Sequence, residues 1–384
     1  MEQEEILRLE AVRLHLQGTS TTSISEQLNR SRQWVHKWLK KYEESQDTGW
    51  YKSGSNTPKN IISKTDDSIE QAVIEIRQRL SSNPYAQKGA INILYEFERL
   101  EIKPPSVATI NRILRRNNLI EKSSVKRQKN TEYPNYFSGV QQMDLIGPRY
   151  LKGGFRFYFY NIIDTENHYA GVYPIADKTA ESIAPCILDF WGNYQLPDFL
   201  QMDNELSFRG SNRHPKGLGL VMRIAFHCGV TPVFIPVAEP WRNGIIEKFN
   251  NNVQKYFYNT QVFKSLEELQ SRAKEFSFFH NENHRYSSQN NRTPNHILKE
   301  TVHKTPLIKD VDLTKKIYIE EGRLFYIRFI RSDLKLHLLG ETFLMKASLK
   351  YSYVVAEIIL EKYVLVVSQN KIVHHIFPFA MSLP

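Results

Sequence analysis

Three different patterns of hydrophobic and polar positions divide the chain into three regions. Up to about residue 122, apolar residues recur every three or four positions, a spacing that predicts amphipathic helices. Residues 137–300 alternate short apolar runs with helical segments, which predicts a mixed α/β region. Residues 315–384 are dominated by Val, Ile, Leu, Tyr and Phe in short runs between turn residues, and we expect about five strands there.

The first helical region, residues 1–45, has the plan of a helix-turn-helix. Gly18 ends a first apolar helix, a second short helix begins near Thr22 with a capping-type serine, and a basic third helix begins at Arg32. In this plan the last helix enters the major groove of DNA. A three-helix protein-interaction module is the alternative. The residues of the third helix that we predict to contact DNA are Arg32, Gln33, His36 and Lys37.

The helical plan is repeated at residues 66–122, after a polar linker at 46–65. Its third predicted helix runs from Ser106, a capping serine, to Asn117. A second, basic linker follows at 123–136. The densest positive run of the chain spans the end of this helix and the second linker, with seven basic residues against one acid, Glu121. A solvated linker face is the usual fate of such runs, but next to two candidate DNA readers we favour phosphate contacts. The candidates are Arg112, Arg115, Arg116, Lys126 and Arg127.

The sequence around three acidic residues of the α/β region predicts that their side chains meet at one site. Asp144 lies in a predicted strand that ends at Gly147-Pro148, and Asp203 ends a second apolar run. Glu247 lies early in a predicted helix, at the edge of its apolar stripe, so its side chain can point toward the strand ends. Two aspartates and one glutamate in this arrangement can hold a pair of Mg²⁺ ions, about 3.5–4 Å apart, at a phosphate.

The acids are embedded in longer motifs. These are Gln142-Met-Asp144, Met202-Asp203-Asn204, Val233-Phe-Ile-Pro236, Glu239-Pro-Trp-Arg-Asn-Gly-Ile-Ile-Glu247-Lys-Phe-Asn250, His280-Asn-Glu-Asn-His-Arg285 and Thr293-Pro294. Together they resemble the motifs of DDE transposases and integrases of the retroviral-integrase superfamily, in particular bacterial insertion-sequence transposases. The resemblance implies a multidomain α/β protein. It has helix-turn-helix modules at 1–45 and 66–122 (the second of winged type), an RNase H-like catalytic core at 137–300 and a small β-barrel at 315–384.

The resemblance also implies an activity. It is that of a DNA transposase or integrase that binds element ends and carries out metal-dependent strand cleavage and strand transfer. Asp144, Asp203 and Glu247 would be the catalytic residues and the ligands of two Mg²⁺ ions, with Mn²⁺ as a substitute. A DNA-binding regulator without strand transfer is the main alternative, and a plain RNase H-like nuclease is a third.

Two features depart from the common pattern. Glu205 stands where a glycine is usual, and 44 positions separate Asp203 from Glu247, against about 36 expected from the resemblance. The surplus fits an insertion at residues 209–217. Glu205 is also the one rival acid that we expect to need a test, since Asp164 more plausibly shapes a turn.

Further side chains near the acids have two interpretations each. Lys248 and Lys255 are candidate phosphate contacts, or else part of a solvated helix face. Trp241 can stack on an unpaired base or belong to the core. Asn204 and Asn243 are expected to fix loop geometry or to contact DNA.

Bulk composition agrees with a DNA-acting protein. The 384 residues carry a formal net charge of +10, which favours a polyanionic partner. The two cysteines form no disulfide framework, and neither a signal peptide nor a membrane-spanning run is found. We therefore expect a soluble protein of the bacterial cytoplasm, associated with the nucleoid and not with a membrane. Its partners would be element ends and target DNA. Because two ends must be held together, at least a dimer is expected, and the need for an accessory ATPase is left open.

Overall fold

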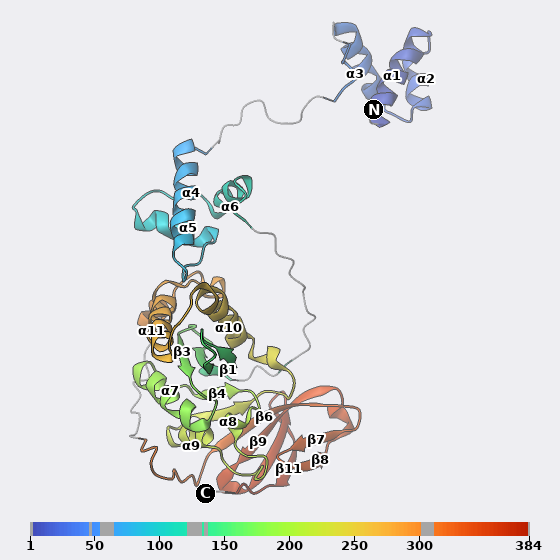
Figure 1. Cartoon of the computed structure of the whole chain (residues 1–384). Coiled ribbons are helices and arrows are strands. Elements are labelled where there is room, and N and C mark those ends of the chain that lie inside the picture. Colours follow the sequence, from blue (N-terminus) through green and yellow to red (C-terminus); the bar gives the residue numbers. More distant parts are fainter. Residues whose placement is uncertain are drawn as a thin grey trace. The chain divides into compact units, whose positions relative to one another are not determined.

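The computed structural model describes residues 3–45, 48–53, 65–120, 133, 137–300 and 311–382. The chain divides into two compact units, Met1–Thr65 and Asp66–Pro384 (Figure 1). Most of the two predicted linkers lies outside the described residues, as do the candidates Lys126 and Arg127.

The N-terminal unit contains the three predicted helices. They are α1 (Gln3–Leu16), α2 (Thr21–Gln27) and α3 (Arg32–Glu44). The hydroxyl oxygens of Ser20 and Ser31 cap α2 and α3 by accepting backbone N–H groups in the first turn of each helix. Val12, Ile24 and Val35 meet in a small core, which fixes α3 with its basic face outward.

The second helical module opens the larger unit. Its helices are α4 (Asp67–Ser82), α5 (Ala90–Arg99) and α6 (Val107–Arg116). Val73, Ile93 and Ile110 form part of its core. The loop between α4 and α5 packs on the rest of the unit, where Tyr85 contacts Phe276 edge-on with ring centroids 5.6 Å apart. The last two residues of the predicted module, 121 and 122, lie outside the described part of the chain, and the winged type stays a prediction.

A nine-stranded mixed sheet organises the remainder, in the order β11-β10-β9-β6-β5-β4-β1-β2-β3. Its strands are β1 (Val140–Tyr150), β2 (Arg156–Asp164), β3 (Ala170–Ile175), β4 (Phe199–Met202), β5 (Thr231–Phe234), β6 (Arg323–Ile330), β9 (Ser352–Ile359), β10 (Val364–Gln369) and β11 (Ile372–Pro378). The central strands β1, β4, β5 and β6 are parallel to their neighbours in this series, and the flanking pairs are antiparallel. A separate hairpin is formed by β7 (Lys335–Leu338) and β8 (Glu341–Leu344).

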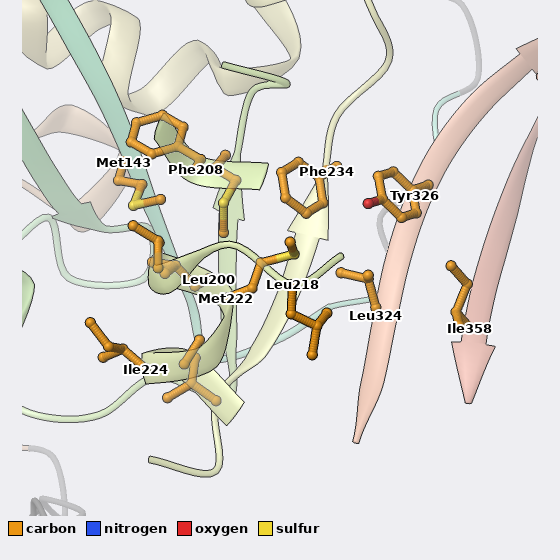
Figure 2. Packing of buried hydrophobic residues seen from close by; sticks show 14 of the residues in the cluster. Met143, Leu200, Phe208, Leu218, Met222, Ile224, Phe234, Leu324, Tyr326 and Ile358 are labelled. Atoms are coloured by element: carbon orange, nitrogen blue, oxygen red, sulfur yellow. The ribbon is translucent and has the colours of Figure 1, made fainter. Parts of the chain in front are cut away.

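Helices cover both faces of this sheet. On one face α7 (Ala180–Asn193) and α9 (Leu220–His227) pack on Met143 and Met202 in a large hydrophobic cluster (Figure 2). On the other face α10 (Gly244–Tyr256) and α11 (Leu266–Asn283) pack on Phe157 and Phe159. The remaining short helices are α8 (Leu206–Arg209), α12 (Pro294–Glu300), η1 (Pro240–Asn243), η2 (Tyr258–Thr260), η3 (Ser287–Gln289), η4 (Ala347–Leu349) and η5 (Leu360–Lys362).

The C-terminal strands differ from the small β-barrel expected at residues 315–384. Strand β6 pairs in parallel with β5, with Phe234 opposite Tyr326, so the C-terminal strands continue the core sheet. Leu324 and Tyr326 enter the large cluster, while Ile327 packs on Val233 on the opposite face. Because β6 is covered on both faces, it occupies a central position, and the red strands lie beside the core in Figure 1. Residues 315–384 are therefore not a separate barrel.

Candidate active site

One predicted acid, Asp144, lies within β1, and another, Asp203, directly follows the neighbouring strand β4. In the parallel pair of β1 and β4, Gln142 stands opposite Gln201. Asp144 follows two residues later within β1, and Asp203 stands two residues after Gln201, directly beyond the end of β4. Side chains two positions apart share a face of a sheet, so both aspartates lie on the face that carries α10.

Three polar side chains, Gln142, Gln201 and Asn243, hold the beginning of α10 against these strands by hydrogen bonds, and we call them the polar clasp. The side-chain oxygen of Gln142 accepts the backbone N–H of Ile246 at 3.0 Å. Gln201 donates to the side-chain oxygen of Asn243 at 2.8 Å, and Asn243 donates to the carbonyl of Met143 at 3.3 Å. Gln142, Gln201 and Asn243 are all buried. Asn243 therefore fixes the geometry of the site, one of its two expected roles.

Glu247 enters the site from the first turn of this helix. One turn later, the buried Asn250 donates to Oδ2 of Asp144 at 2.7 Å and accepts from Asn161 at 2.8 Å. Residues three apart on a helix lie on one side of it, so the contact of Asn250 places Glu247 beside Asp144. Asp203 is oriented by the backbone N–H of Glu205, which it accepts at 2.9 Å.

Electrostatic interactions connect Asp144 with the other two predicted acids. Burial, followed by the negative charge of Asp203, raises the pKa of Asp144 to about 7, and Glu247 contributes in the same direction. Hydrogen bonds from Leu145 and Asn250 oppose the rise. The pKa of Asp203 is also raised, chiefly by burial. The site is therefore a buried concentration of negative charge that a cation would relieve.

The carboxylates are not gathered into a preformed coordination shell. Within the described part of the chain, no three His, Cys, Asp or Glu side chains converge closely enough to form a metal-binding cluster. The donor set still fits hard divalent cations, which prefer carboxylate oxygens. Asp144, Asp203 and Glu247 are the residues that would hold them.

Removing one of these charges should stabilise the metal-free protein. Asp203→Asn keeps an oxygen for the N–H of Glu205 and removes the charge that opposes ionisation of Asp144. In EDTA at pH 8 we expect a higher Tm, by about 2–4 °C for each kcal/mol gained. Differential scanning fluorimetry measures this. Glu275→Gln, which removes a surface carboxylate paired with Arg272, is the matched control and should change little. A lower Tm for Asp203→Asn would contradict the proposed repulsion.

The rival acids have other partners. Glu205 caps α8 and pairs with Lys178 at 3.0 Å. Asp164 accepts the backbone N–H groups of Glu166 and Asn167, which confirms its expected role in a turn. Glu239 pairs with Arg242 and accepts the hydroxyl of Tyr353.

Most predicted DNA contacts are exposed. On α3 this holds for Arg32, Gln33, His36 and Lys37, and on α6 for Arg112, Arg115 and Arg116. Arg116 is engaged in an ion pair with Glu70. Lys248 and Lys255 lie exposed on α10, and Trp241 is 52% exposed, so it does not belong to the core. Exposure agrees with DNA contact but does not separate it from a solvated face.

A buried histidine cluster lies behind α10. His168, His280 and His284 pack around Tyr286, and His168 lies 4.0 Å from the Tyr286 ring, centroid to centroid. Burial, aided by the positive charge of Lys248, lowers the pKa of His168 to about 4, and burial lowers that of His280 to about 3. The cluster lies apart from the carboxylates and supports α11 by packing.

This cluster should make the protein acid-sensitive. A folded-state pKa below the unfolded value of about 6.5 means that unfolding takes up protons, so stability falls as the pH drops below about 6.5. Each such histidine should cost up to about 1.4 kcal/mol per pH unit in that range. Urea unfolding between pH 7.5 and 5 measures the slope. His280→Gln should make the slope of the unfolding free energy against pH shallower, whereas replacing the exposed His296 with Gln should not. Equal slopes for His280→Gln and the parent protein would contradict the role of the buried histidines in acid sensitivity.

The motifs pointed to the acids but not to the residues that orient them. Gln142, Gln201 and Asn250 were missed as functional residues. The signal was present, because Gln-Met-Asp occurs twice, at 142–144 and at 201–203. A repeated glutamine two residues before each acid predicts a shared face of adjacent strands.

Comparisons with known proteins were consistent with this geometry. Residues 2–51 match the family model of a homeodomain-like domain, and residues 228–294 match that of an integrase core domain. The second match contains Glu247 and its motif, and the two confirm the resemblance predicted from the motifs. No curated protein matches the chain.

The chain also resembles solved integrase cores. One is the HTLV-2 integrase catalytic core domain in complex with magnesium, in its trimeric form: 14% identity, 41% of this chain and 94% of that chain covered, TM-score 0.32. Another is the catalytic core domain of BIV integrase: 17% identity, 43% and 95% covered, TM-score 0.32. Among the described helices, none is both long and apolar enough to cross a membrane.

Proposed function

From the homeodomain-like and integrase core segments, we infer that this protein is a DNA transposase or integrase that cleaves and joins DNA strands. The observation that supports the proposal is that Asp144 in β1 and Asp203 after the adjacent parallel strand β4 stand beside the start of α10, the helix that carries Glu247 and is hydrogen-bonded to β1. Such carboxylates direct their oxygens at a phosphate held outside the sheet edge.

We propose Asp144, Asp203 and Glu247 as the ligands of Mg²⁺, with Mn²⁺ as a substitute. When bound, a pair of such cations supplies charge neutralisation at the reacting phosphate. The protein supplies orientation: Asn250 holds one oxygen of Asp144, and the N–H of Glu205 holds one oxygen of Asp203. The second oxygen of Asp144 accepts the backbone N–H of Leu145 at 2.9 Å, so both of its oxygens are held in place.

The reaction we propose has two displacements at phosphorus. Water first displaces the 3′ oxygen at an element end, which leaves a free 3′ hydroxyl. This hydroxyl then attacks a target phosphodiester, forming one phosphodiester bond as another breaks. No covalent bond to the protein is needed, so positioning and charge compensation are the tasks of the site.

The helical segments would deliver DNA to this site. Residues 1–45 and 66–122 are proposed as readers of the element ends, through the exposed basic faces of α3 and α6. Lys248 and Lys255, on the exposed side of α10, are proposed phosphate contacts near Glu247. Since two ends must be joined to one target, we propose at least a dimer as the active form.

Strand transfer by the purified protein tests the proposal. A labelled element-end duplex and a plasmid target are incubated with the protein in Mg²⁺ and, separately, in EDTA. We expect joined product in Mg²⁺ alone. Shifted DNA without nicking or joining in Mg²⁺ would instead favour the DNA-binding regulator.

A further inference from the structure

A groove with several polar residues in its lining lies beside Asn204, the residue that follows Asp203. It has a volume of about 570 Å³ and separates the loop after α8 from the β7–β8 hairpin. Arg209 and Asn212 line one wall, His337 and Thr342 the other, and Tyr326 and Arg328 come from β6. The groove exists because β6 is the fourth strand of the parallel series, which brings Arg328 to the edge where Asp203 lies.

Arg328 joins the groove to the candidate active site. Its guanidinium donates to the side-chain oxygen of Asn204 at 2.8 Å and to the carbonyl of Ile235 at 3.0 Å. Asn204 follows Asp203 directly and donates to the same carbonyl at 2.8 Å. These acceptors are neutral, so the positive charge of Arg328 is not compensated by them. Burial lowers the pKa of Arg328 to about 10, which leaves it charged at neutral pH.

Tyr326 presents a hydroxyl without a partner. Its ring stacks on Phe234 with centroids 4.9 Å apart (Figure 2). The side chain is 1% exposed, and its hydroxyl forms no hydrogen bond to any described residue. Buried hydroxyls are nearly always paired in folded proteins. Tyr326 lines the groove together with Arg209 and Arg328, whose guanidinium lies over the Tyr326 ring at 4.9 Å, so a ligand with an acceptor oxygen would satisfy the hydroxyl.

The other charges of the groove are positive or already paired. Arg209 donates to the carbonyl of Asn204 at 2.9 Å and extends toward Asn212. The single acid, Glu341, is engaged in an ion pair with Lys216. His337 is hydrogen-bonded to Thr342. The hydrogen bonds of both guanidinium groups go to neutral oxygens, so their two positive charges and the hydroxyl of Tyr326 favour an anion.

We propose that this groove binds a backbone phosphate of the DNA strand that extends from the reacting phosphodiester. Guanidinium and hydroxyl donors are the usual partners of phosphate oxygens in protein–DNA complexes. The proposal gives the insertion at 209–217 a task, since this segment supplies one wall. It rests on the proposed function for the identity of the ligand as DNA.

Tyr326→Phe is the sharpest test, because it removes the hydroxyl and keeps the stacked ring. The full-length variant should be at least as stable as the parent, since an unpaired buried hydroxyl is removed. Its affinity for a fluorescein-labelled duplex of mixed sequence, measured by anisotropy in Mg²⁺, should fall by about 3–10-fold. Unchanged affinity would overturn the role of Tyr326 as a phosphate ligand.

Charge removal gives an independent readout. Arg209→Gln should weaken binding of the same duplex about tenfold, and the slope of log affinity against log salt should decrease by about 0.9. Arg323→Gln is the matched control. It removes an arginine at the opposite end of β6 that pairs with Glu357. It should leave the slope unchanged. Equal slopes for Arg209→Gln and the parent protein would overturn the proposal.

These measurements separate the groove from the proposed function. They record binding alone, so a loss in both groove variants supports the groove even if the parent protein joins no strands. Conversely, strand transfer by the parent together with unchanged DNA binding in both variants would refute the groove and leave the proposed function intact.

Discussion

Replacing Asp144 with Asn is expected to abolish strand transfer, by about 10³-fold or more, while DNA affinity stays within about twofold. The amide cannot supply the negative oxygen that a divalent cation requires. Its single side-chain oxygen can keep one of the two hydrogen bonds that Asp144 accepts, from Asn250 or from the backbone N–H of Leu145. Joined product from a labelled duplex and anisotropy with the same duplex measure the two effects separately.

The rival acid provides the control for this experiment. Glu205→Gln removes a carboxylate that is near Asp203 but occupied by Lys178 and by the cap of α8. Its strand transfer should fall less than about tenfold. Glu247→Gln should resemble Asp144→Asn. Equal loss of DNA binding and strand transfer in Asp144→Asn would refute its catalytic assignment, and a full loss in Glu205→Gln would add a fourth acid to the site.

Ending the chain at residue 300 is expected to unfold the core as well as to remove the C-terminal strands. The truncation leaves β5 without its partner β6 and strips the large hydrophobic cluster of many fully buried side chains. Each is worth about 1.5–3 kcal/mol. Their combined loss is comparable to the whole stability of a domain, about 5–15 kcal/mol. The lost side chains include Leu324, Tyr326, Ile330, Val354, Ile358 and Leu365.

Removing residues 1–65 is the matched truncation, because this segment is a compact unit of its own. The shortened chain should keep a cooperative thermal transition by circular dichroism and resist limited proteolysis. The chain ending at 300 should show neither property and should bind hydrophobic dyes. A cooperative transition in that chain would mean that the C-terminal strands are dispensable for the fold.

The local parts of the site could be predicted from sequence. Asp144, Asp203 and Glu247 each stand in a short motif whose strand or helix is set by nearby residues. The α3 helix was predicted to begin at Arg32 and to expose Arg32, Gln33, His36 and Lys37, and both points are confirmed, since its apolar spacing is local. Even the clasp had a signal, in the repeated Gln-Met-Asp.

The pairing of β6 could not be predicted in this way. Its apolar run is equally typical of a barrel strand and of a central strand in the core sheet. The hydrophobic pattern indicates which side chains are buried but does not identify the strand with which β6 pairs. The partner, β5, lies about ninety residues earlier in the chain. Arg328 was missed for the same reason: its link to Asn204 spans 124 positions and depends on that pairing.

Strand β6 is synthesised long after its partner β5, and this order affects folding during translation. Strand β5 leaves the ribosome well before its partner β6. At a synthesis rate of about 5–20 residues per second, the edge of β5 stays unpaired for roughly 5–20 s, until β6 has been made. During that interval Asn204 lacks the support of Arg328. A nascent chain therefore carries all three acids before it can hold the Asp203 loop in place. The order of translation therefore delays assembly of the candidate active site until β6 has been made.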